Sequence, residues 1–391
     1  MALKIVGPDF FDLSALLSEE EIAVQNMTNE WVRDRFYPLI SKHYRDGTFP
    51  FELQAEMGEM GFFGSTLPEK YGTAGINGVA YGLMMQELER GDSGLRSFAS
   101  VQGSLVMWPI WKYGSEEQKE KWLPLLASGE KIGCFGLTEP DYGSNPGGMI
   151  TRVKQEGDKF ILNGTKMWIT NSPVADVALI WAKDEGGEVR GFLVERGTGG
   201  FETPEIKGKL SLRASMTGEI VLNNCAIPLE NQLPEANGLK APLSCLTQAR
   251  YGINWGVMGA AIACYEEAVD YAKTRIQFDK PIAAFQLTQQ KLAEMLNEIT
   301  KAQFLTLQLG RLKDRATLNH KQVSLAKMNN VRMAIEIARS ARTILGASGI
   351  TDEYVSMRHA ANLESVLTYE GTHEMHTLVV GESITGIPAY R

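Results

Sequence analysis

Two kinds of hydrophobic pattern follow one another along this chain of 391 residues, and their order is the strongest constraint on its fold. From about residue 18 to residue 126, apolar residues recur at helical spacing, and the long stretches after about residue 239 return to that spacing. Between them, β-prone runs such as 177–181 and 219–222 are separated by glycine-rich turns. A doubly wound nucleotide-binding fold would alternate strands and helices throughout, so this order excludes it and predicts an α+β protein.

The length of the chain predicts several packed units, because a single hydrophobic core usually stops growing below this size. We place an N-terminal α-helical domain at 1–132, a middle β domain at 133–238 and a C-terminal α-helical bundle at 239–391. In the middle domain, Asn163-Gly164 lies between two β-prone runs, which predicts a hairpin turn at this dipeptide.

Composition excludes several classes of protein. A formal net charge of -8 and a pI near 5.4 argue against a nucleic-acid groove. The most apolar run, 251–265, contains Asn254 and is shorter than the roughly 20 residues of a bilayer span, so no stable membrane insertion is expected. Four cysteines lie far apart, which predicts free buried thiols in a reducing compartment and no metal site. With no secretory or transit pattern at the start, we expect a cytoplasmic bacterial protein, or a mitochondrial-matrix one if the chain is a processed eukaryotic form.

Glu370 is the candidate catalytic base. It is a lone glutamate among apolar and small residues near the C-terminus. Burial of a carboxylate is costly and would raise its pKa toward the operating pH, where a general base works best. The alternative is a glutamate that caps a helix.

The segment 89–97 is the candidate for substrate selection. Asp92 or Ser93 can cap a new helix, which would bring Glu89 and Arg96 together across a helix junction. A guanidinium offers a planar fork of donors to a carboxylate. The alternative is an ordinary surface ion pair.

Three segments, 135–144, 167–172 and 367–373, resemble in sequence and order those of the acyl-CoA dehydrogenase flavoproteins, and the likeness extends over nearly the whole chain. The resemblance implies an N-terminal all-α domain, a middle β domain and a C-terminal four-helix bundle, with FAD between the last two. It also implies a homotetramer that passes electrons to an electron-transfer flavoprotein. The likeness is greatest to members that oxidise and decarboxylate glutaryl-CoA to crotonyl-CoA and CO2.

The resemblance also implies a role for individual residues. It implies that Glu370 is the catalytic base and that Trp168 packs against the flavin ring. It also implies that Arg96 and Ser97 bind the far carboxylate of the acyl group. The residues implied to bind the substrate are Glu89, Arg96, Ser97, Ser144, Leu243, Leu246, Arg250, Tyr369 and Gly371. Those implied to bind FAD are Phe135, Leu137, Thr138, Gly143, Ser144, Trp168, Ile169, Thr170, Arg275, Phe278, Gln286, Leu345, Gly346, Gly349, Thr372 and Glu374. In the family, the 345–349 set contacts the FAD of a partner subunit, so the cofactor would bridge two chains.

Leu95 stands where the family usually has a tyrosine, which leaves the length of the acyl group open. Three other functions also stay open at this point. A short-chain monocarboxylic acyl-CoA dehydrogenase and an acyl-CoA oxidase, neither of which decarboxylates, fit the same motifs. A helical interaction protein that kept the scaffold and lost catalysis is the alternative from a different class.

Overall fold

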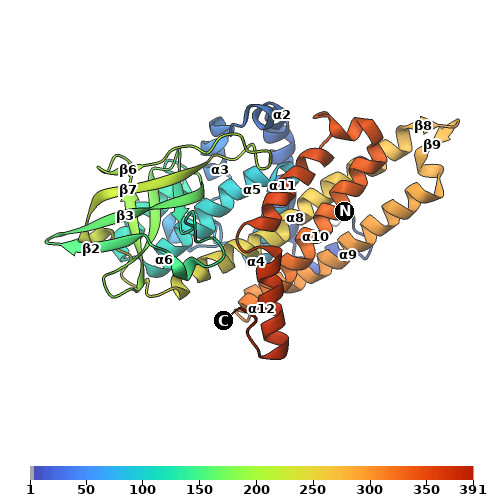
Figure 1. Cartoon of the computed structure of the whole chain (residues 1–391). Helices are drawn as coiled ribbons and strands as arrows, with labels where there is room; N and C mark the ends of the chain where they lie inside the picture. The colour runs from blue at the N-terminus through green and yellow to red at the C-terminus, as the bar shows by residue number, and fades with distance from the viewer. Residues whose placement is uncertain (1–3, 391) are drawn as a thin grey trace.

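The computed structural model describes residues 4–390; residues 1–3 and 391, at the outer ends of the predicted first and third domains, lie outside the described part. A helical unit is followed by a β-sheet unit and then by a second helical unit (Figure 1). The sheet lies at one end of the molecule and the long C-terminal helices run to the other end (Figure 1). The predicted α+β class and the predicted order of its parts are confirmed.

The first helical unit is built around two helices that meet at Asp92. Its helices are α1 (Glu19–Trp31), α2 (Tyr37–Asp46), α3 (Gln54–Glu59), α4 (Gly78–Gly91), α5 (Ser93–Ser100), α6 (Trp108–Tyr113) and α7 (Glu116–Ala127), with π-helical segments at Val32–Phe36 and Val101–Met107. Every residue of α4 and α5 is buried. Asp92 has an extended backbone and its side chain accepts a hydrogen bond from the Gly94 N–H, so it ends α4 and caps α5.

The middle unit is a seven-stranded sheet within residues 133–228. Its strands are β1 (Gly133–Gly136), β2 (Arg152–Glu156), β3 (Lys159–Thr170), β4 (Val177–Lys183), β5 (Val189–Glu195), β6 (Phe201–Glu202) and β7 (Thr217–Pro228). The long strands β3 and β7 pair antiparallel, and β4 is buried along its length except for Lys183, which is partly exposed.

The hairpin predicted at Asn163-Gly164 is wrong. Both residues lie inside β3, and the pairing with β7 shifts in register between Leu162 and Gly164 instead of reversing. Gly164 has φ +150°, and a Cβ on it would lie 2.4 Å from the Thr151 Oγ1 atom. The glycine therefore permits a close approach of Thr151 and a bulge, whereas the chain reverses earlier, between β2 and β3, at Gly157.

The second helical unit consists of long helices around a buried central one. Its elements are α8 (Lys240–Thr274), the short hairpin β8 (Ile276–Gln277) and β9 (Lys280–Pro281), α9 (Gln286–Asp314), α10 (His320–Leu345), α11 (Ser356–Thr368) and α12 (His373–Thr385). Residues 251–264 of α8 are all buried, between α4 on one side and α10 on the other. Among residues 4–390 no helix is both long and apolar enough to cross a membrane.

Glycine lets α8 lie directly against α4. A Cβ on Gly256 of α8 would lie 2.1 Å from the Glu89 Oε2 atom of α4. Any larger residue would displace the Glu89 carboxylate, so this contact of the two helices fixes the position of a predicted site residue.

Candidate active site

Glu370 lies in a sharp turn between α11 and α12. Its φ is +51° and that of Gly371 is +91°, so two left-handed residues follow one another. A glutamate rarely adopts this conformation, and it persists only where its surroundings hold it. Thr372 caps α12 by accepting a hydrogen bond from the Met375 N–H, so Glu370 is not the helix cap considered as the alternative from the sequence.

Two basic side chains hold this turn through its backbone. The Nε of Arg250, on α8, donates to the Glu370 carbonyl oxygen at 2.6 Å. The Nζ of Lys327, on α10, donates to the carbonyl oxygens of Tyr369, at 2.5 Å, and of Gly371, at 2.8 Å. Three successive carbonyl oxygens therefore accept from two cations.

The Glu370 carboxylate is suited to accept a proton. Its Oε2 atom is inaccessible to solvent and has no hydrogen-bond partner among the described residues. Burial raises the pKa of Glu370, while the charges of Lys327, Arg96 and Arg250 oppose this effect. An unpaired buried carboxylate whose pKa is shifted toward neutrality is typical of a general base.

Arg96 forms a buried cluster beside this base. Its Nε donates to the Glu89 Oε2 atom at 2.6 Å, and its second terminal nitrogen donates to the Tyr369 hydroxyl. The Ser97 hydroxyl lies 3.3 Å from the same Tyr369 oxygen. Glu89 is 0% exposed and Arg96 1%, so they are not the surface ion pair considered as the alternative. The two bonds use two of the five N–H donors of the guanidinium, which leaves donors for a second carboxylate.

Trp168 stands out on a bulge near the C-terminal end of β3. The pairing of β3 with β7 shifts between Lys166 and Ile169, Trp168 has φ +62°, and its side chain is 56% exposed. The Met167 N–H donates to the Thr138 carbonyl oxygen at 2.9 Å, so the two predicted cofactor loops lie together. An exposed indole on a bulge offers an apolar face for a planar ring, which fits a flavin.

The loop that follows Thr138 is fixed by a buried ion pair. Lys166 donates to the Glu139 Oε1 atom at 2.8 Å, and the Glu139 carboxylate also accepts from the N–H groups of Ile150 and Thr151. Burial lowers the pKa of Lys166 to about 8, and its bond to Glu139 opposes this shift. Gly143 and Ser144 are exposed beyond this anchor, where a ligand can reach them.

The other residues predicted to bind the substrate or the flavin differ in exposure. Leu243, Leu246 and Arg250 follow one another along α8, and Leu243 is exposed whereas Leu246 is half-buried. Thr170 and Thr372 are half-buried and Glu374 is exposed. Phe135, Leu137 and Ile169 are buried in the core.

A second set of predicted cofactor residues lies far from the first. Arg275, Phe278 and Gln286 surround the β8–β9 hairpin, at the end of the molecule opposite the sheet (Figure 1). Arg250 and Arg275 are separated along α8 by about 37 Å, at 1.5 Å per residue. The structure therefore does not bring the two sets together within one chain. Leu345 is the last residue of α10, and Gly346 and Gly349 lie in the 3-10 segment Gly346–Ile350 that follows it.

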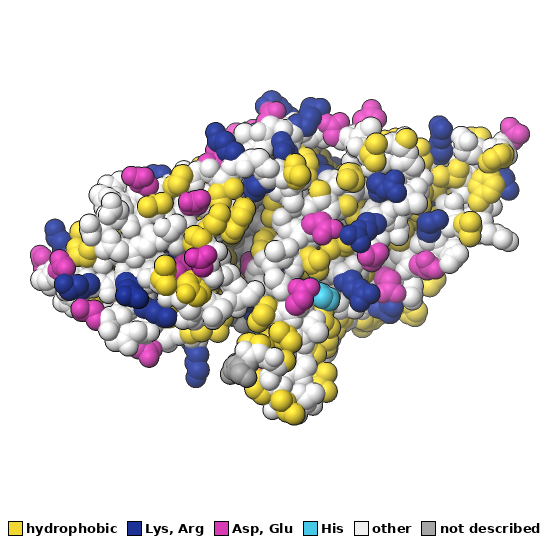
Figure 2. Space-filling model, viewed as in Figure 1, with side chains coloured by type: hydrophobic (Ala, Val, Ile, Leu, Met, Phe, Trp, Pro, Cys, Tyr) yellow, Lys and Arg dark blue, Asp and Glu magenta, His cyan; other side chains and the backbone are white. Residues whose placement is uncertain are grey.

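The β8–β9 end of the molecule exposes apolar side chains. Phe278 is 87% exposed with φ +51°, and Ile276 and Leu287 are also exposed. Hydrophobic side chains gather over this end and over α12 in the space-filling view (Figure 2). Apolar patches of this kind mark surfaces that another molecule covers.

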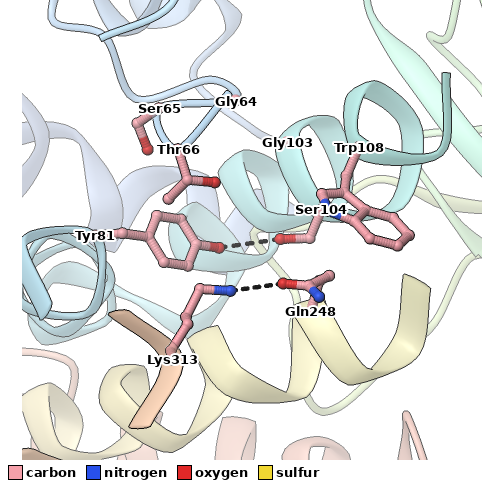
Figure 3. Close-up of a pocket in the computed structure, with 9 residues that line it drawn as sticks. All are labelled: Gly64, Ser65, Thr66, Tyr81, Gly103, Ser104, Trp108, Gln248 and Lys313. Carbon is pink, nitrogen blue, oxygen red and sulfur yellow. Dashed lines mark hydrogen bonds between the residues drawn. The ribbon is translucent and has the colours of Figure 1, made fainter. Parts of the chain in front are cut away.

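A small pocket elsewhere contains none of the predicted residues. It lies between the loop 64–66, α4, α8 and the end of α9, where Lys313 donates to the Gln248 side chain at 2.6 Å and the hydroxyls of Tyr81 and Ser104 lie 3.1 Å apart (Figure 3). Its free volume of about 10 Å³ holds about one water molecule, so it is not a thioester site.

Sequence reasoning missed Lys327. It is 2% exposed on the buried face of α10, one turn from Val323 and one turn from Val331. A lysine among apolar residues at helical spacing was the available signal, because such a charge needs a buried partner.

Comparison of the sequence with known protein families identifies the class of enzyme to which this fold and this base belong. Family models match residues 18–130 (acyl-CoA dehydrogenase, N-terminal domain), 134–225 (middle domain) and 236–385 (C-terminal domain). An acyl-CoA dehydrogenase of Bacillus subtilis is 34% identical over 375 residues, which cover 95% of this chain and 99% of the relative. The chain belongs to the acyl-CoA dehydrogenase family, whose enzymes use FAD.

Two solved structures are more similar still, and both are glutaryl-CoA dehydrogenases from Mycobacterium smegmatis. One is 56% identical with a TM-score of 0.96, and the match covers 98% of this chain and 99% of the other. The second, in complex with FADH2, is 53% identical with a TM-score of 0.97, and the match covers 99% and 100%.

Proposed function

We propose that this enzyme oxidises and decarboxylates glutaryl-CoA to crotonyl-CoA and CO2. The observation that carries the proposal is the buried ion pair of Glu89 and Arg96, which bonds to the Tyr369 hydroxyl beside Glu370. A purely apolar acyl group has no use for a buried guanidinium, whereas a dicarboxylic one does. The similarity to two glutaryl-CoA dehydrogenases supports the same substrate.

Glu370 begins the reaction by removing the α-proton of the thioester. Its own backbone N–H donates to no other group among residues 4–390, so it is free to polarise the thioester carbonyl and acidify the α-carbon. Bound FAD supplies the acceptor for the hydride that leaves the β-carbon. Arg96 and Ser97 bind the far carboxylate and so hold the acyl group in register with the base.

Glu370 also completes the decarboxylation. Loss of CO2 from the enzyme-bound glutaconyl thioester breaks the bond to the far carboxyl carbon and leaves the electron pair on the dienolate. The proton that Glu370 took from the α-carbon then passes to the γ-carbon and gives crotonyl-CoA. A raised pKa suits both steps, because the carboxyl must hold the proton between them.

We also propose how FAD is held. Thr138, Ser144, Trp168 and Thr170 would contact its flavin half. The remote set of Arg275, Phe278 and Gln286 would contact the adenine half of an FAD that the 345–349 segment of a partner subunit completes. The separation of these sets and the exposed apolar surface at β8–β9 support an assembly of several copies, for which we propose the homotetramer.

Three further proposals concern the electron acceptor, the cellular compartment and the domain boundaries. Electrons leave the enzyme for an electron-transfer flavoprotein. The four buried free thiols support a reducing compartment, for which we propose the bacterial cytoplasm. We keep 132/133 and 238/239 as the boundaries between the three domains.

A comparison of two substrates tests the proposed function. Purified FAD-loaded protein is assayed by dye reduction with glutaryl-CoA and with butyryl-CoA, and we expect a clear preference for glutaryl-CoA. Preference for butyryl-CoA would establish a monocarboxylic short-chain enzyme instead. Peroxide formation without a dye would identify an acyl-CoA oxidase, and a colourless protein that binds no FAD would favour an interaction protein.

A further inference from the structure

We infer that Lys327 is a positioning residue for the base: its two hydrogen bonds hold the turn 369–371 in the conformation that aims the Glu370 carboxylate at the substrate. This inference rests on the proposed role of Glu370. It assigns a function to a buried cation on α10 that contacts neither of the two cofactor loops nor the Glu89–Arg96 pair.

The contacts of Lys327 are specific to the turn. Its Nζ donates to the carbonyl oxygens of Tyr369 and Gly371, which flank the carbonyl of Glu370. The Glu370 carbonyl accepts from Arg250. All three carbonyls of the turn are therefore fixed from two different helices, and a shift of α10 relative to α8 would move the base.

The turn needs this support for two reasons. Glu370 and Gly371 are both left-handed, and a non-glycine residue keeps such a conformation only when its neighbours enforce it. Tyr369 is also the C-cap of α11, where carbonyl oxygens lack helical partners and carry the negative end of the helix dipole. A lysine at this place satisfies one of these carbonyls and neutralises that end.

Lys327 also contributes to the electrostatics of the base. The other charged or titratable groups that interact with Glu370 are Arg250 of α8, Arg96 of α5, Tyr81 of α4, Tyr369 and, on α12, His376. Burial lowers the pKa of His376 to about 3, so it adds no charge near neutral pH. Burial lowers the pKa of Lys327 to about 7, and the charge of Glu370 opposes this shift. Loss of this cation would raise the pKa of Glu370 further.

The test compares Lys327→Met, Lys327→Arg and the control Lys321→Met in the FAD-loaded enzyme. Lys321 lies on the same helix and is exposed. Because misplacement of a catalytic group by about 1 Å costs on the order of 100-fold, we expect Lys327→Met to lower kcat by about 10- to 100-fold with a smaller change in KM. The acid limb of its pH profile should move to higher pH. Lys327→Arg keeps a cation and its donors, so its loss should be smaller and its acid limb should stay in place. Lys321→Met should match the wild type.

The outcomes are separable from those of the proposed function. Both glutaryl-CoA and butyryl-CoA are assayed, and Lys327→Met should slow them by the same factor, because the base serves both. Wild-type kcat and an unmoved acid limb in Lys327→Met would overturn the inference. If Lys327→Met loses FAD, the test uses Lys327→Gln, which keeps a hydrogen-bond donor but has no charge. An unmoved acid limb in the pH profile of Lys327→Gln would also overturn the inference. A wild type that prefers butyryl-CoA overturns only the proposed substrate, whereas one that oxidises neither thioester overturns both proposals.

Discussion

The two sides of the site differ in how complete they are within one chain. At the acyl side, Glu89 and Arg96 are fully buried, bonded to each other and joined to the turn of the base through Tyr369. At the cofactor side, Trp168 is 56% exposed, and Phe278, in the β8–β9 hairpin, is 87% exposed. The groups that select and deprotonate the substrate are preorganised by the fold. The groups proposed to hold FAD are exposed in a single chain and would be covered by the cofactor and a partner copy.

The two sides differ because an unpaired charge costs more free energy to bury than an aromatic side chain costs to expose. A buried ion must be paired before the ligand arrives, because an unpaired buried charge destabilises the fold. Aromatic side chains can stay exposed until a ligand or another subunit covers them. Changes on the acyl side should therefore alter chemistry or stability, and changes on the cofactor side should alter occupancy.

The largest effect on the acyl side is expected from Glu370→Gln. The amide cannot accept the α-proton, so kcat should fall by about 1000-fold or more, within the range of general-base removal. Dye reduction measures the rate, and the flavin absorbance checks that FAD is retained. Turnover near the wild-type rate would refute Glu370 as the base.

Arg96→Met should change selectivity rather than turnover in general. Removal of one partner of a buried charge contact costs about 2–5 kcal/mol, so activity on glutaryl-CoA should fall by about 30-fold or more, with a much smaller loss on butyryl-CoA. Equal losses on both substrates would mean that Arg96 does not bind a carboxylate.

A stability control separates packing from recognition in that variant. Arg96→Met leaves Glu89 buried and unpaired, which should lower the free energy of unfolding by about 3–5 kcal/mol. The double variant Glu89→Gln/Arg96→Met should recover much of this stability in urea denaturation while activity on glutaryl-CoA stays low. Recovery of that activity would show that the single variant was merely unstable.

On the cofactor side, Arg275→Ala should weaken FAD binding and spare chemistry. Loss of a charged hydrogen bond costs about 1.5–3 kcal/mol, so the Kd for FAD should rise by about 10- to 100-fold, and saturating FAD should restore kcat. The neighbouring exposed Lys273→Ala serves as the control and should bind FAD as the wild type does. A lasting loss of kcat in Arg275→Ala would remove the contrast between the two sides.

The smallest expected effect is in the pH dependence of the unaltered enzyme. Burial raises the pKa of Glu370, so its carboxyl takes up a proton at a pH where exposed glutamates are still ionised. A protonated base cannot act, so kcat should fall as the pH falls through this raised value. Constant kcat down to about pH 4.3, the value of a free glutamate, would show that the base is not desolvated.

The sequence predicts features that depend on neighbouring residues and misses those that depend on distant contacts. The cap at Asp92 and the meeting of Glu89 with Arg96 follow from a short local pattern, and the structure has both. Asn163-Gly164 has the same local pattern as a hairpin turn, but the glycine is required by Thr151. No local pattern reveals that β3 runs straight through it.

The contacts of the site that join different helices could not be predicted from the sequence, because they too depend on residues that are distant along the chain. Lys327 meets the turn of Glu370 only once α10 packs beside α11 and α12. Arg250, expected from the resemblance to bind the substrate, uses its Nε to hold the Glu370 carbonyl. The distance between Arg250 and the β8–β9 hairpin likewise appears only when α8 is seen as one long helix (Figure 1).

The most direct test of a preorganised acid–base site for a dicarboxylic thioester is the identity of its product. Purified FAD-loaded enzyme is incubated with glutaryl-CoA and a dye acceptor, and the thioester product is identified by its mass. We expect crotonyl-CoA with release of CO2. Accumulation of glutaconyl-CoA, or recovery of unchanged glutaryl-CoA, would contradict the roles assigned to Arg96 and Glu370.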